Sequence, residues 1–311
     1  MNIVVCGASG MIGRALVRHL VMRGETVTVV GRALSMLQRC FPDLPDQKCW
    51  SDLTAEWLAT QDVVVNLAGE NISAARWRDA QRQRLMESRV RTSAMLATLC
   101  AACGDAAPRL INASAIGIYG VYPTIAEQNA VTFSEHTAAA PSQDFLSEIG
   151  RAWEAAVAPA EQAGVSVLRL RFAVVLSRSG GALAALLPSF KMGLGARLGS
   201  GEQPFSWVAL EDVVGAISWC IDHPALTGPL NVVADEVVSQ KQFARQLAAA
   251  LHRPQLLRLP GFVVKQLFGQ MGEELLLNGQ RVASTALKAS GFAYRYPCLA
   301  AYFSAWQQGQ K

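Results

Sequence analysis

Apolar runs alternate with amphipathic stretches through the first half of the chain. Five short runs are almost wholly apolar and predict strands: Ile3–Cys6, Thr26–Val30, Val63–Leu67, Leu110–Ala113 and Ser166–Phe172. Three longer segments between them predict helices: Met11–Arg23, Arg76–Cys103 and Phe145–Gly164. Strands that are apolar on both faces and separated by helices form right-handed crossovers in a parallel sheet. The pattern therefore predicts an α/β fold with a Rossmann-like, doubly wound parallel sheet.

The second half has a less regular pattern. Its helical spacing predicts helices at Asp212–Ile221, Gln240–Leu251, Phe262–Leu277 and Ser284–Ser290, and its glycines predict loops at Gly180–Gly181 and Gly193–Gly201. No repeat, low-complexity tract or linker divides the chain. We therefore expect a dinucleotide-binding domain over residues 1–175, with its sheet completed by later segments. A smaller, partly interleaved C-terminal substrate lobe is expected over residues 176–311.

Composition narrows the class of protein. Of the 311 residues, 51% are hydrophobic and 17% charged, which excludes a disordered chain. The net charge of +4 is too weak to indicate nucleic-acid binding, and no apolar stretch reaches the about 18–20 residues that span a bilayer. The start of the sequence has no signal-peptide pattern, and the seven scattered cysteines are typical of reduced thiols. We expect a cytoplasmic protein with neither a nucleic-acid nor a membrane partner.

The strongest motif lies directly after the first predicted strand. Gly7-Ala8-Ser9-Gly10-Met11-Ile12-Gly13 reads G-x-x-G-x-x-G and leads into a predicted helix. Gly7 permits the tight turn, Gly10 lets a pyrophosphate approach the backbone, and Gly13 lets the helix pack on the sheet. Unpaired N–H groups at the helix start bind the pyrophosphate. The motif therefore predicts a dinucleotide site.

The end of the second predicted strand discriminates between NAD(H) and NADP(H). An NAD site usually places an acidic residue there, which binds the ribose hydroxyls. Here Val29-Val30 runs into Gly31-Arg32 without an acid, and a guanidinium pairs with a 2′-phosphate. The sequence favours NADP(H) over NAD(H). The alternative for Arg32 is a solvated loop arginine.

Four further segments carry a family resemblance. They are Asn66-Leu67-Ala68-Gly69-Glu70, Ser114-Ala115-Ile116-Gly117-Ile118-Tyr119-Gly120, Leu198-Gly199-Ser200-Gly201 with Ser206-Trp207, and Asn278-Gly279-Gln280-Arg281-Val282. Together with the glycine loop, they make the chain resemble the extended short-chain dehydrogenases/reductases, which include nucleotide-sugar epimerases. More narrowly, the chain resembles the atypical epimerase-family group of that superfamily, over nearly its whole length.

The resemblance implies a Rossmann-like sheet, a small C-terminal substrate lobe and a bound nicotinamide dinucleotide. Carried over position by position, it implies these cofactor-binding residues: Gly7, Ser9, Gly10, Met11, Ile12 and Gly13 in the phosphate loop, Arg32 at the 2′-phosphate, Leu67, Ala68 and Gly69 beside the riboses, and Phe172 and Val174 beside the nicotinamide.

The superfamily's usual proton relay is absent from the sequence. That relay is Tyr-x-x-x-Lys, in which the lysine lowers the tyrosine pKa and the tyrosine moves the proton. No lysine of this chain follows a tyrosine at that spacing, and the resemblance places Leu146 and Gly150 at the two positions. The usual serine or threonine position falls on Ala115, and a shift of one residue would place Ser114 there.

Other polar residues are candidates for the chemistry. Tyr119, Ser114 and Glu70 could handle a proton or a substrate carbonyl. The substrate candidates are Lys191 and Arg197 for an anionic group and Trp207 for a pocket wall. Ordinary structural alternatives are sheet packing for the tyrosine, helix capping for the glutamate and solvated loops for the two basic residues. The four histidines show no metal-binding spacing, so we expect no metal.

Two functions remain open from the sequence. One is an NADP-dependent oxidoreductase or nucleotide-sugar-epimerase-like enzyme that acts on a small polar molecule, which the glycine loops favour. The other is a non-catalytic NADP(H)-binding sensor or regulatory protein, which the missing Tyr/Lys pair favours. The arginine-rich stretch Arg76–Arg91 fits a solvated or subunit-contacting helix, so a homodimer also remains open.

Overall fold

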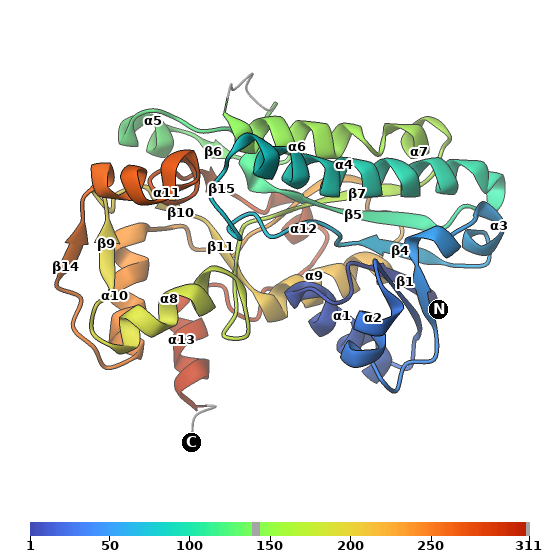
Figure 1. Ribbon diagram of the computed structural model, residues 1–311, viewed down its shortest axis with the longest axis horizontal. Coiled ribbons are helices and arrows are strands. Elements are labelled where there is room, and N and C mark those ends of the chain that lie inside the picture. The colour runs from blue at the N-terminus through green and yellow to red at the C-terminus, as the bar shows by residue number, and fades with distance from the viewer. Residues whose placement is uncertain (139–143, 309–311) are drawn as a thin grey trace.

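A parallel sheet of seven strands forms the centre of the protein (Figure 1). The computed structural model describes residues 1–138 and 144–308. The strands, in chain order, are β1 (Asn2–Cys6), β2 (Thr26–Gly31), β3 (Gln47–Cys49), β4 (Val63–Asn66), β5 (Arg109–Ala115), β7 (Val167–Phe172) and β12 (Gly228–Val232). Their order across the sheet is β12-β7-β5-β4-β1-β2-β3, so the direction of winding reverses between β1 and β4. This is the doubly wound, Rossmann-like arrangement, and the predicted fold class is confirmed.

Helices cover both faces of this sheet (Figure 1). On one face lie α1 (Met11–Met22), α2 (Leu34–Cys40) and α9 (Leu210–Asp222); on the other lie α3 (Ala55–Leu58), α4 (Asp79–Ala102), α6 (Phe145–Ala155) and α7 (Ala158–Gln162). Successive side chains of a strand point to opposite faces. Accordingly, Ile3 and Val5 join the core beneath α1, whereas Val4 and Cys6 join the core beneath α4. Burial on both faces explains why the central strands are mostly apolar.

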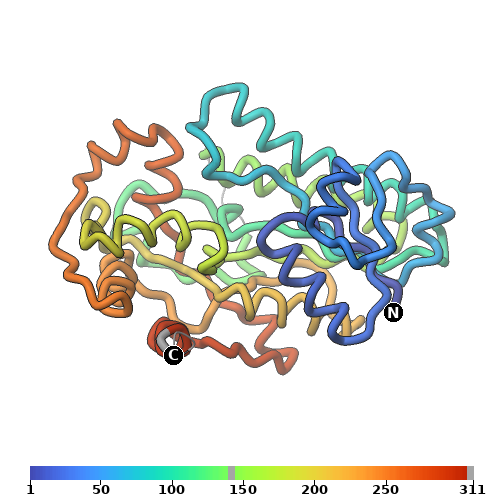
Figure 2. Tube along the Cα trace, turned by 60° about the horizontal axis from the view of Figure 1, so that its bottom comes forward, coloured from blue at the N-terminus to red at the C-terminus, as the bar shows by residue number. Residues whose placement is uncertain are grey.

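The C-terminal part builds a second core and also contributes to the first. The second core is enclosed by α8 (Gly181–Lys191), α10 (Gln240–Ala250) and α13 (Leu299–Gln308). In contrast, α9 packs on α1, and β12 extends the large sheet beside β7. The chain therefore returns to the large sheet after it has begun to build the second core. Figure 2 shows the N-terminal segment at one end of the molecule and the segment with α10 at the other.

Short elements join these layers. Four small strand pairs are β6 (Thr132–Phe133) with β15 (Arg281–Val282), β8 (Val174–Leu176) with β11 (Trp207–Ala209), β9 (Ala196–Leu198) with β14 (Leu257–Leu259), and β10 (Pro204–Phe205) with β13 (Val238–Ser239). The remaining helices are α5 (Ile125–Ala130), α11 (Gly261–Leu276) and α12 (Thr285–Ala289), with 3-10 turns η1 (Trp50–Asp52), η2 (Gly104–Ala106) and η3 (Ile116–Tyr119).

Three predicted elements are wrong in detail. The helix expected over Phe145–Gly164 is two helices, because Pro159 lacks the N–H that an unbroken helix needs and instead lies in the first turn of α7. The helix expected over Phe262–Leu277 is kinked at Gly269, whose φ is 62°. The loop expected over Gly193–Gly201 contains β9. Helices α2, α8 and α13 and strand β12 were not predicted.

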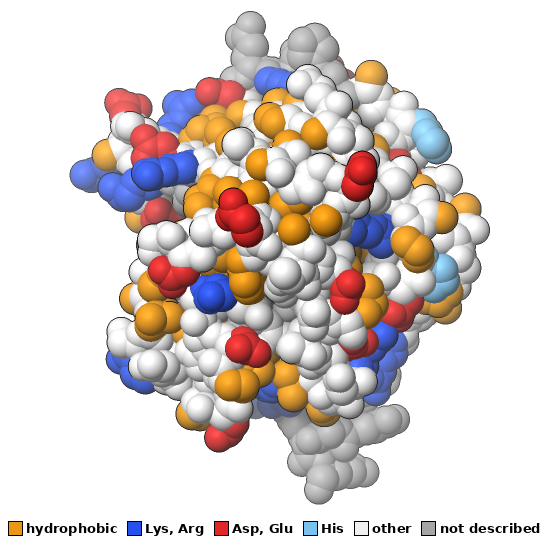
Figure 3. Space-filling model, turned by 90° about the vertical axis from the view of Figure 1, so that its right-hand side faces the viewer, with side chains coloured by type: hydrophobic (Ala, Val, Ile, Leu, Met, Phe, Trp, Pro, Cys, Tyr) orange, Lys and Arg blue, Asp and Glu red, His pale blue; other side chains and the backbone are white. Residues whose placement is uncertain are grey.

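The surface facing the viewer in Figure 3 carries mixed charge. Acidic and basic side chains are scattered over it, with apolar atoms between them. Within residues 1–138 and 144–308, no helix has both the length and the apolar character required to cross a bilayer.

Candidate functional site

The glycine loop joins β1 to α1, at the point where the winding of the sheet reverses. Gly7 has a φ of +73°, and a Cβ added there would lie 2.7 Å from the Ala68 nitrogen and from the Leu67 oxygen. A Cβ added to Gly13 would lie 2.5 Å from the Gly7 oxygen. Side chains are excluded at both positions by backbone atoms, which cannot move aside as a flexible side chain could.

The first turn of α1 presents unpaired N–H groups. Gly10 is its N-cap, no side chain caps the turn, and no acidic residue lies within it. The first backbone hydrogen bond of the helix runs from Arg14 N–H to the Gly10 oxygen at 2.9 Å, which leaves the N–H groups of residues 11–13 for a ligand. The positive end of the helix dipole also lies here. The loop therefore fits a pyrophosphate.

Arg32 follows β2 and is exposed. In the two described ranges, no carboxylate oxygen lies within 4 Å of its guanidinium. Since β2 lies beside β1 in parallel register, Arg32 is placed at the same edge of the sheet as the glycine loop. A free guanidinium at the end of β2 fits a 2′-phosphate.

The end of β4 is fixed against the glycine loop by a buried amide network. Asn66 accepts a hydrogen bond from Ala68 N–H at 3.1 Å and donates to Asn112 Oδ1 at 2.7 Å. Ser93 donates to the same Asn112 oxygen at 3.0 Å. Asn66, Asn112 and Ser93 were missed by the sequence reasoning, although an asparagine at the end of an apolar strand is a recognisable signal. The network holds the segment 67–69 where it abuts Gly7.

A second glycine pair also lies against the phosphate loop. A Cβ added to Gly180 would lie 3.1 Å from Met11 Sδ, and one added to Gly181 would lie 3.4 Å from Met11 Cε. The segment after β8 therefore reaches the glycine loop. Of the two residues predicted beside the nicotinamide, Phe172 is buried at the end of β7 and Val174 is partly exposed at the start of β8.

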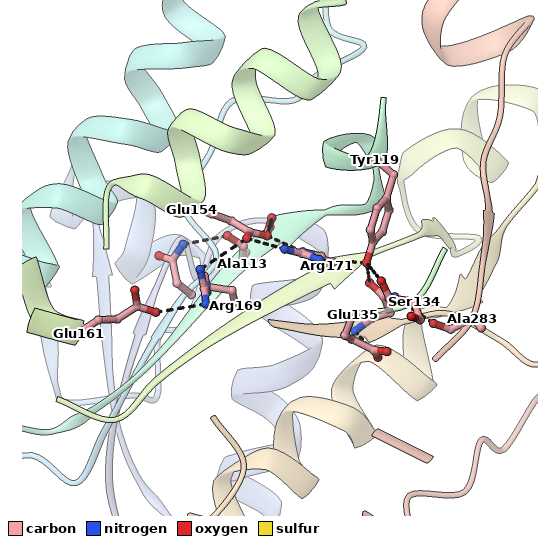
Figure 4. Close-up of polar contacts among 12 residues, drawn as sticks. Ala113, Tyr119, Ser134, Glu135, Glu154, Glu161, Arg169, Arg171 and Ala283 are labelled. Carbon is pink, nitrogen blue, oxygen red and sulfur yellow. Dashed lines mark hydrogen bonds and ion pairs between the residues drawn. The ribbon is translucent and has the colours of Figure 1, made fainter. Parts of the chain in front are cut away.

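Tyr119 and Ser114, two of the three predicted proton-handling residues, lie in a buried hydrogen-bond network. The Tyr119 side chain is fully buried (Figure 4). Its hydroxyl lies 2.8 Å from Asn231 Oδ1 and 3.0 Å from the backbone oxygen of Ser134. Arg171 Nη1 donates a hydrogen bond to the same hydroxyl at 2.9 Å. Burial raises the pKa of Tyr119 despite the nearby guanidinium. The hydroxyl is therefore a protonated member of an internal network.

Ser114 belongs to the same network. Its hydroxyl donates to Glu154 Oε1 at 2.7 Å, and the residue is 1% exposed. Glu154 in turn receives two hydrogen bonds from Arg171, at 2.7 and 2.8 Å, within the interior. The hydroxyl hydrogen of Ser114 is therefore committed to this ion pair. Glu154, Arg171 and Asn231 were not singled out from the sequence.

The three substrate candidates do not converge on the glycine loop. Lys191 is exposed at the end of α8, about 15 Å along the helix from the Gly181 contact. Arg197 lies in β9, with its stem packed beside Gly201. Trp207 is fully buried in β11, and its ring lies 5.8 Å from that of Tyr302. Trp207 therefore belongs to the second core, away from the glycine loop.

Glu70 is the remaining proton-handling candidate, and its carboxylate reaches solvent. The side chain is 34% exposed, lies one residue after Gly69 and accepts a hydrogen bond from Gln81 at 2.9 Å. Its backbone is held on both sides by α4, since its N–H donates to Ser88 Oγ at 3.0 Å and its oxygen accepts from Arg89 Nη2 at 2.9 Å. The carboxylate is thus fixed at the cofactor-binding edge of the sheet.

The resemblance places the tyrosine and lysine of the usual relay at Leu146 and Gly150, which lie where η3 packs on α6. A Cβ added to Gly150 would lie 3.0 Å from both Cα and Cβ of Ile118, and one added to Gly117 would lie 3.2 Å from Leu146 Cβ. A lysine at residue 150 would have to displace this backbone. The close packing of η3 on α6 therefore disfavours any side chain at residue 150.

We expect Gly150→Ala to lower the free energy of unfolding by about 1–3 kcal/mol, because overpacking against a backbone atom is not relieved by a rotamer change. Chemical denaturation of purified protein measures this change. The matched control is Gly215→Ala in α9, whose added Cβ would meet only the Phe292 ring at 3.6 Å. That control should keep or slightly raise stability, and an equal loss in both variants would contradict the packing argument.

Comparison with known proteins gives the class to which this fold and site belong. A family model described as the NAD dependent epimerase/dehydratase family matches residues 3–233, and a domain of unknown function, DUF1731, matches residues 259–305. The chain therefore belongs to the NAD dependent epimerase/dehydratase family. Within it, the chain is an atypical extended short-chain dehydrogenase/reductase.

Individual relatives match over nearly the whole chain. Epimerase family protein Mb2239 of Mycobacterium bovis is 36% identical over 299 residues, which cover 94% of this chain and 93% of the relative. The structure of human epimerase family protein SDR39U1 with NADPH has a TM-score of 0.85 at 30% identity and covers 99% of each chain. A nucleoside-diphosphate sugar epimerase structure from Corynebacterium glutamicum has a TM-score of 0.77 at 29% identity and covers 100% of this chain and 59% of that one.

Proposed function

We propose that this protein is an NADPH-binding oxidoreductase of the epimerase family that acts on a small polar substrate. One observation carries the proposal. The start of α1, which no side chain caps, lies at the same edge of the sheet as Arg32, whose exposed guanidinium has no carboxylate partner among the described residues. The similarity to human SDR39U1, which was solved with NADPH, supports the choice of nucleotide. When bound, NADPH supplies a hydride.

The residues of the chain divide the remaining tasks. The N–H groups at the start of α1 bind the pyrophosphate, and Arg32 binds the 2′-phosphate. The segment 67–69, fixed by Asn66, forms the adjoining floor of the cleft. Glu70 accepts or returns the proton, because its carboxylate alone among the three candidates is partly exposed while its backbone is held rigidly.

A second candidate function rests on the buried network. Because Tyr119 and Ser114 are committed to internal hydrogen bonds, the protein could bind NADP(H) as a sensor or regulatory protein without catalysing a reaction. NADPH binding without NADPH oxidation across a panel of small carbonyl compounds would favour the sensor. We also propose a cytoplasmic location, which agrees with the seven free cysteines. For the oligomeric state, we propose a homodimer.

We expect Arg32→Ala to weaken NADPH binding about 10–100-fold and to leave NADH binding within about twofold, because only NADPH carries the charge that Arg32 pairs with. Calorimetric titration of both nucleotides measures the ratio. Arg39→Ala is the matched control, since Arg39 is an exposed arginine on the neighbouring α2. An equal loss for NADPH and NADH in Arg32→Ala would remove Arg32 from 2′-phosphate recognition.

A further inference from the structure

Arg89 of α4 lies directly behind the end of β4. Its guanidinium donates to the Leu85 oxygen at 3.0 Å and to the Glu70 oxygen at 2.9 Å, both of them neutral backbone acceptors. The central carbon of the guanidinium lies 5.1 Å from the centre of the Trp153 ring. A Cβ added to Gly69 would lie 3.5 Å from Arg89 Cγ and Cζ. The cation is therefore sandwiched between the strand end and an aromatic ring of α6.

The charge of Arg89 has no direct counter-ion in the described parts of the chain. Within residues 1–138 and 144–308, no carboxylate oxygen lies within 4 Å of this guanidinium. The Glu70 carboxylate, which acts on it electrostatically, is hydrogen-bonded to Gln81 and lies 3.9 Å from Arg84. Burial lowers the pKa of Arg89 to about 10, so the group is still cationic at neutral pH. Removing the charged guanidinium of Arg89 from water costs free energy, and its hydrogen bonds to neutral carbonyl oxygens offset only part of that cost.

The topology places this charge on the opposite side of the strand-order reversal from Arg32. Arg32 marks the adenosine side, beyond β1 at the end of β2, whereas Arg89 lies across the reversal in strand order, at the end of β4. A dinucleotide bridges the two halves of a doubly wound sheet at that reversal. Arg89 lies behind the segment 67–69. This segment contacts the glycine loop directly, since a Cβ added to Gly7 would lie 2.7 Å from the Ala68 nitrogen.

The same region lacks the lysine of the usual relay. Gly150 of α6 stands at that position and packs on Ile118, while Trp153, one turn later on α6, faces Arg89. A cation from α4 is thus held beside a helix that has glycine where the resemblance places the relay lysine.

We propose that Arg89 supplies the positive charge on the nicotinamide side of the cleft and thereby selects the reduced, uncharged nicotinamide ring over the oxidised, cationic one. This inference rests on the proposed function, because it requires NADP(H) to bind at the glycine loop. A fixed cation repels the ring of NADP⁺ and leaves the ring of NADPH unaffected, so the discrimination follows from Coulomb's law.

Equilibrium titrations of wild type, Arg89→Met and Arg89→Lys with NADPH and with NADP⁺ test the proposal. Methionine keeps an unbranched stem against Gly69 and Trp153 but removes the charge, and lysine keeps the charge but loses the guanidinium geometry. We expect Arg89→Met to lower the preference for NADPH over NADP⁺ about five- to tenfold, and Arg89→Lys to keep most of it. Arg91→Met, an exposed arginine of the same helix, should leave the preference unchanged.

The outcomes separate the inference from the proposed function. An unchanged preference in Arg89→Met overturns the inference while NADPH binding by the wild type upholds the function. An equal loss in Arg89→Lys and Arg89→Met also overturns it, because the carbonyl hydrogen bonds rather than the charge would then matter. Wild-type protein that binds neither nucleotide overturns both.

Discussion

Replacement of Gly13 by alanine should abolish measurable nucleotide binding and destabilise the fold. The new Cβ would lie 2.5 Å from the Gly7 oxygen and 2.7 Å from Ala8 Cα, so α1 would have to move away from β1. We expect the NADPH affinity to fall at least about 100-fold and the free energy of unfolding to fall by about 3 kcal/mol. Titration and chemical denaturation of the same preparation measure the two effects.

Gly10→Ala provides the comparison that separates binding from stability. Its added Cβ would meet only the Gly7 oxygen, at 3.3 Å, and Gly10 is exposed where a pyrophosphate approaches the backbone. We expect a loss of binding with a stability change of under about 1 kcal/mol. NADPH binding of wild-type strength in Gly13→Ala would show that the glycine loop is only a tight turn.

Neutralising Glu154 should give the largest stability loss of any single charge change in the interior. Glu154 and Arg171 have side chains 6% and 9% exposed and are joined by two hydrogen bonds, and Arg169 lies 3.8 Å from the same carboxylate. Removing one partner of a buried ion pair leaves the other charge uncompensated. We therefore expect Glu154→Gln to lower the free energy of unfolding by about 3–5 kcal/mol, as measured by urea denaturation.

Glu161→Gln is the matched control for this change. Glu161 also pairs with Arg169, at 3.4 Å, but its side chain is 35% exposed, so its loss should cost under about 1 kcal/mol. At urea concentrations below its unfolding midpoint, the Glu154→Gln variant should bind NADPH with an affinity within about threefold of the wild type, because the hydrogen-bond network of Glu154 lies inside the protein rather than at the glycine loop. A stability loss in Glu154→Gln no larger than that of the control would contradict the stabilising role of the buried ion pair shown in Figure 4.

The pattern of the chain predicts the sheet because burial on both faces leaves a direct trace in the sequence. Residues 63–65 of β4 form a continuous apolar run, and the glycine loop has a local motif. Strand β12 leaves a weaker trace, since it begins with Gly228 and Pro229 and finds its place only through pairing with β7. A short edge strand of this kind depends on its partner rather than on its own propensity.

The site was predicted where its residues are neighbours in sequence and missed where they are not. Tyr119 looked free because its partners, Arg171 and Asn231, are 52 and 112 residues away in the sequence. A signal for the buried pair was nevertheless present. Arg169 and Arg171 interrupt an otherwise apolar strand, and charges in a strand covered on both faces require buried partners. Sequence spacing alone does not say which partners those are.

Calorimetric titration of the wild-type protein with NADPH and with NADH, after removal of any co-purified nucleotide, tests the central claim most directly. The account predicts saturable binding of NADPH at one site per chain, at least about tenfold tighter than NADH, because Arg32 pairs with the 2′-phosphate. Absence of binding for both nucleotides would contradict the assignment of the glycine loop. Tighter binding of NADH would contradict the role of Arg32.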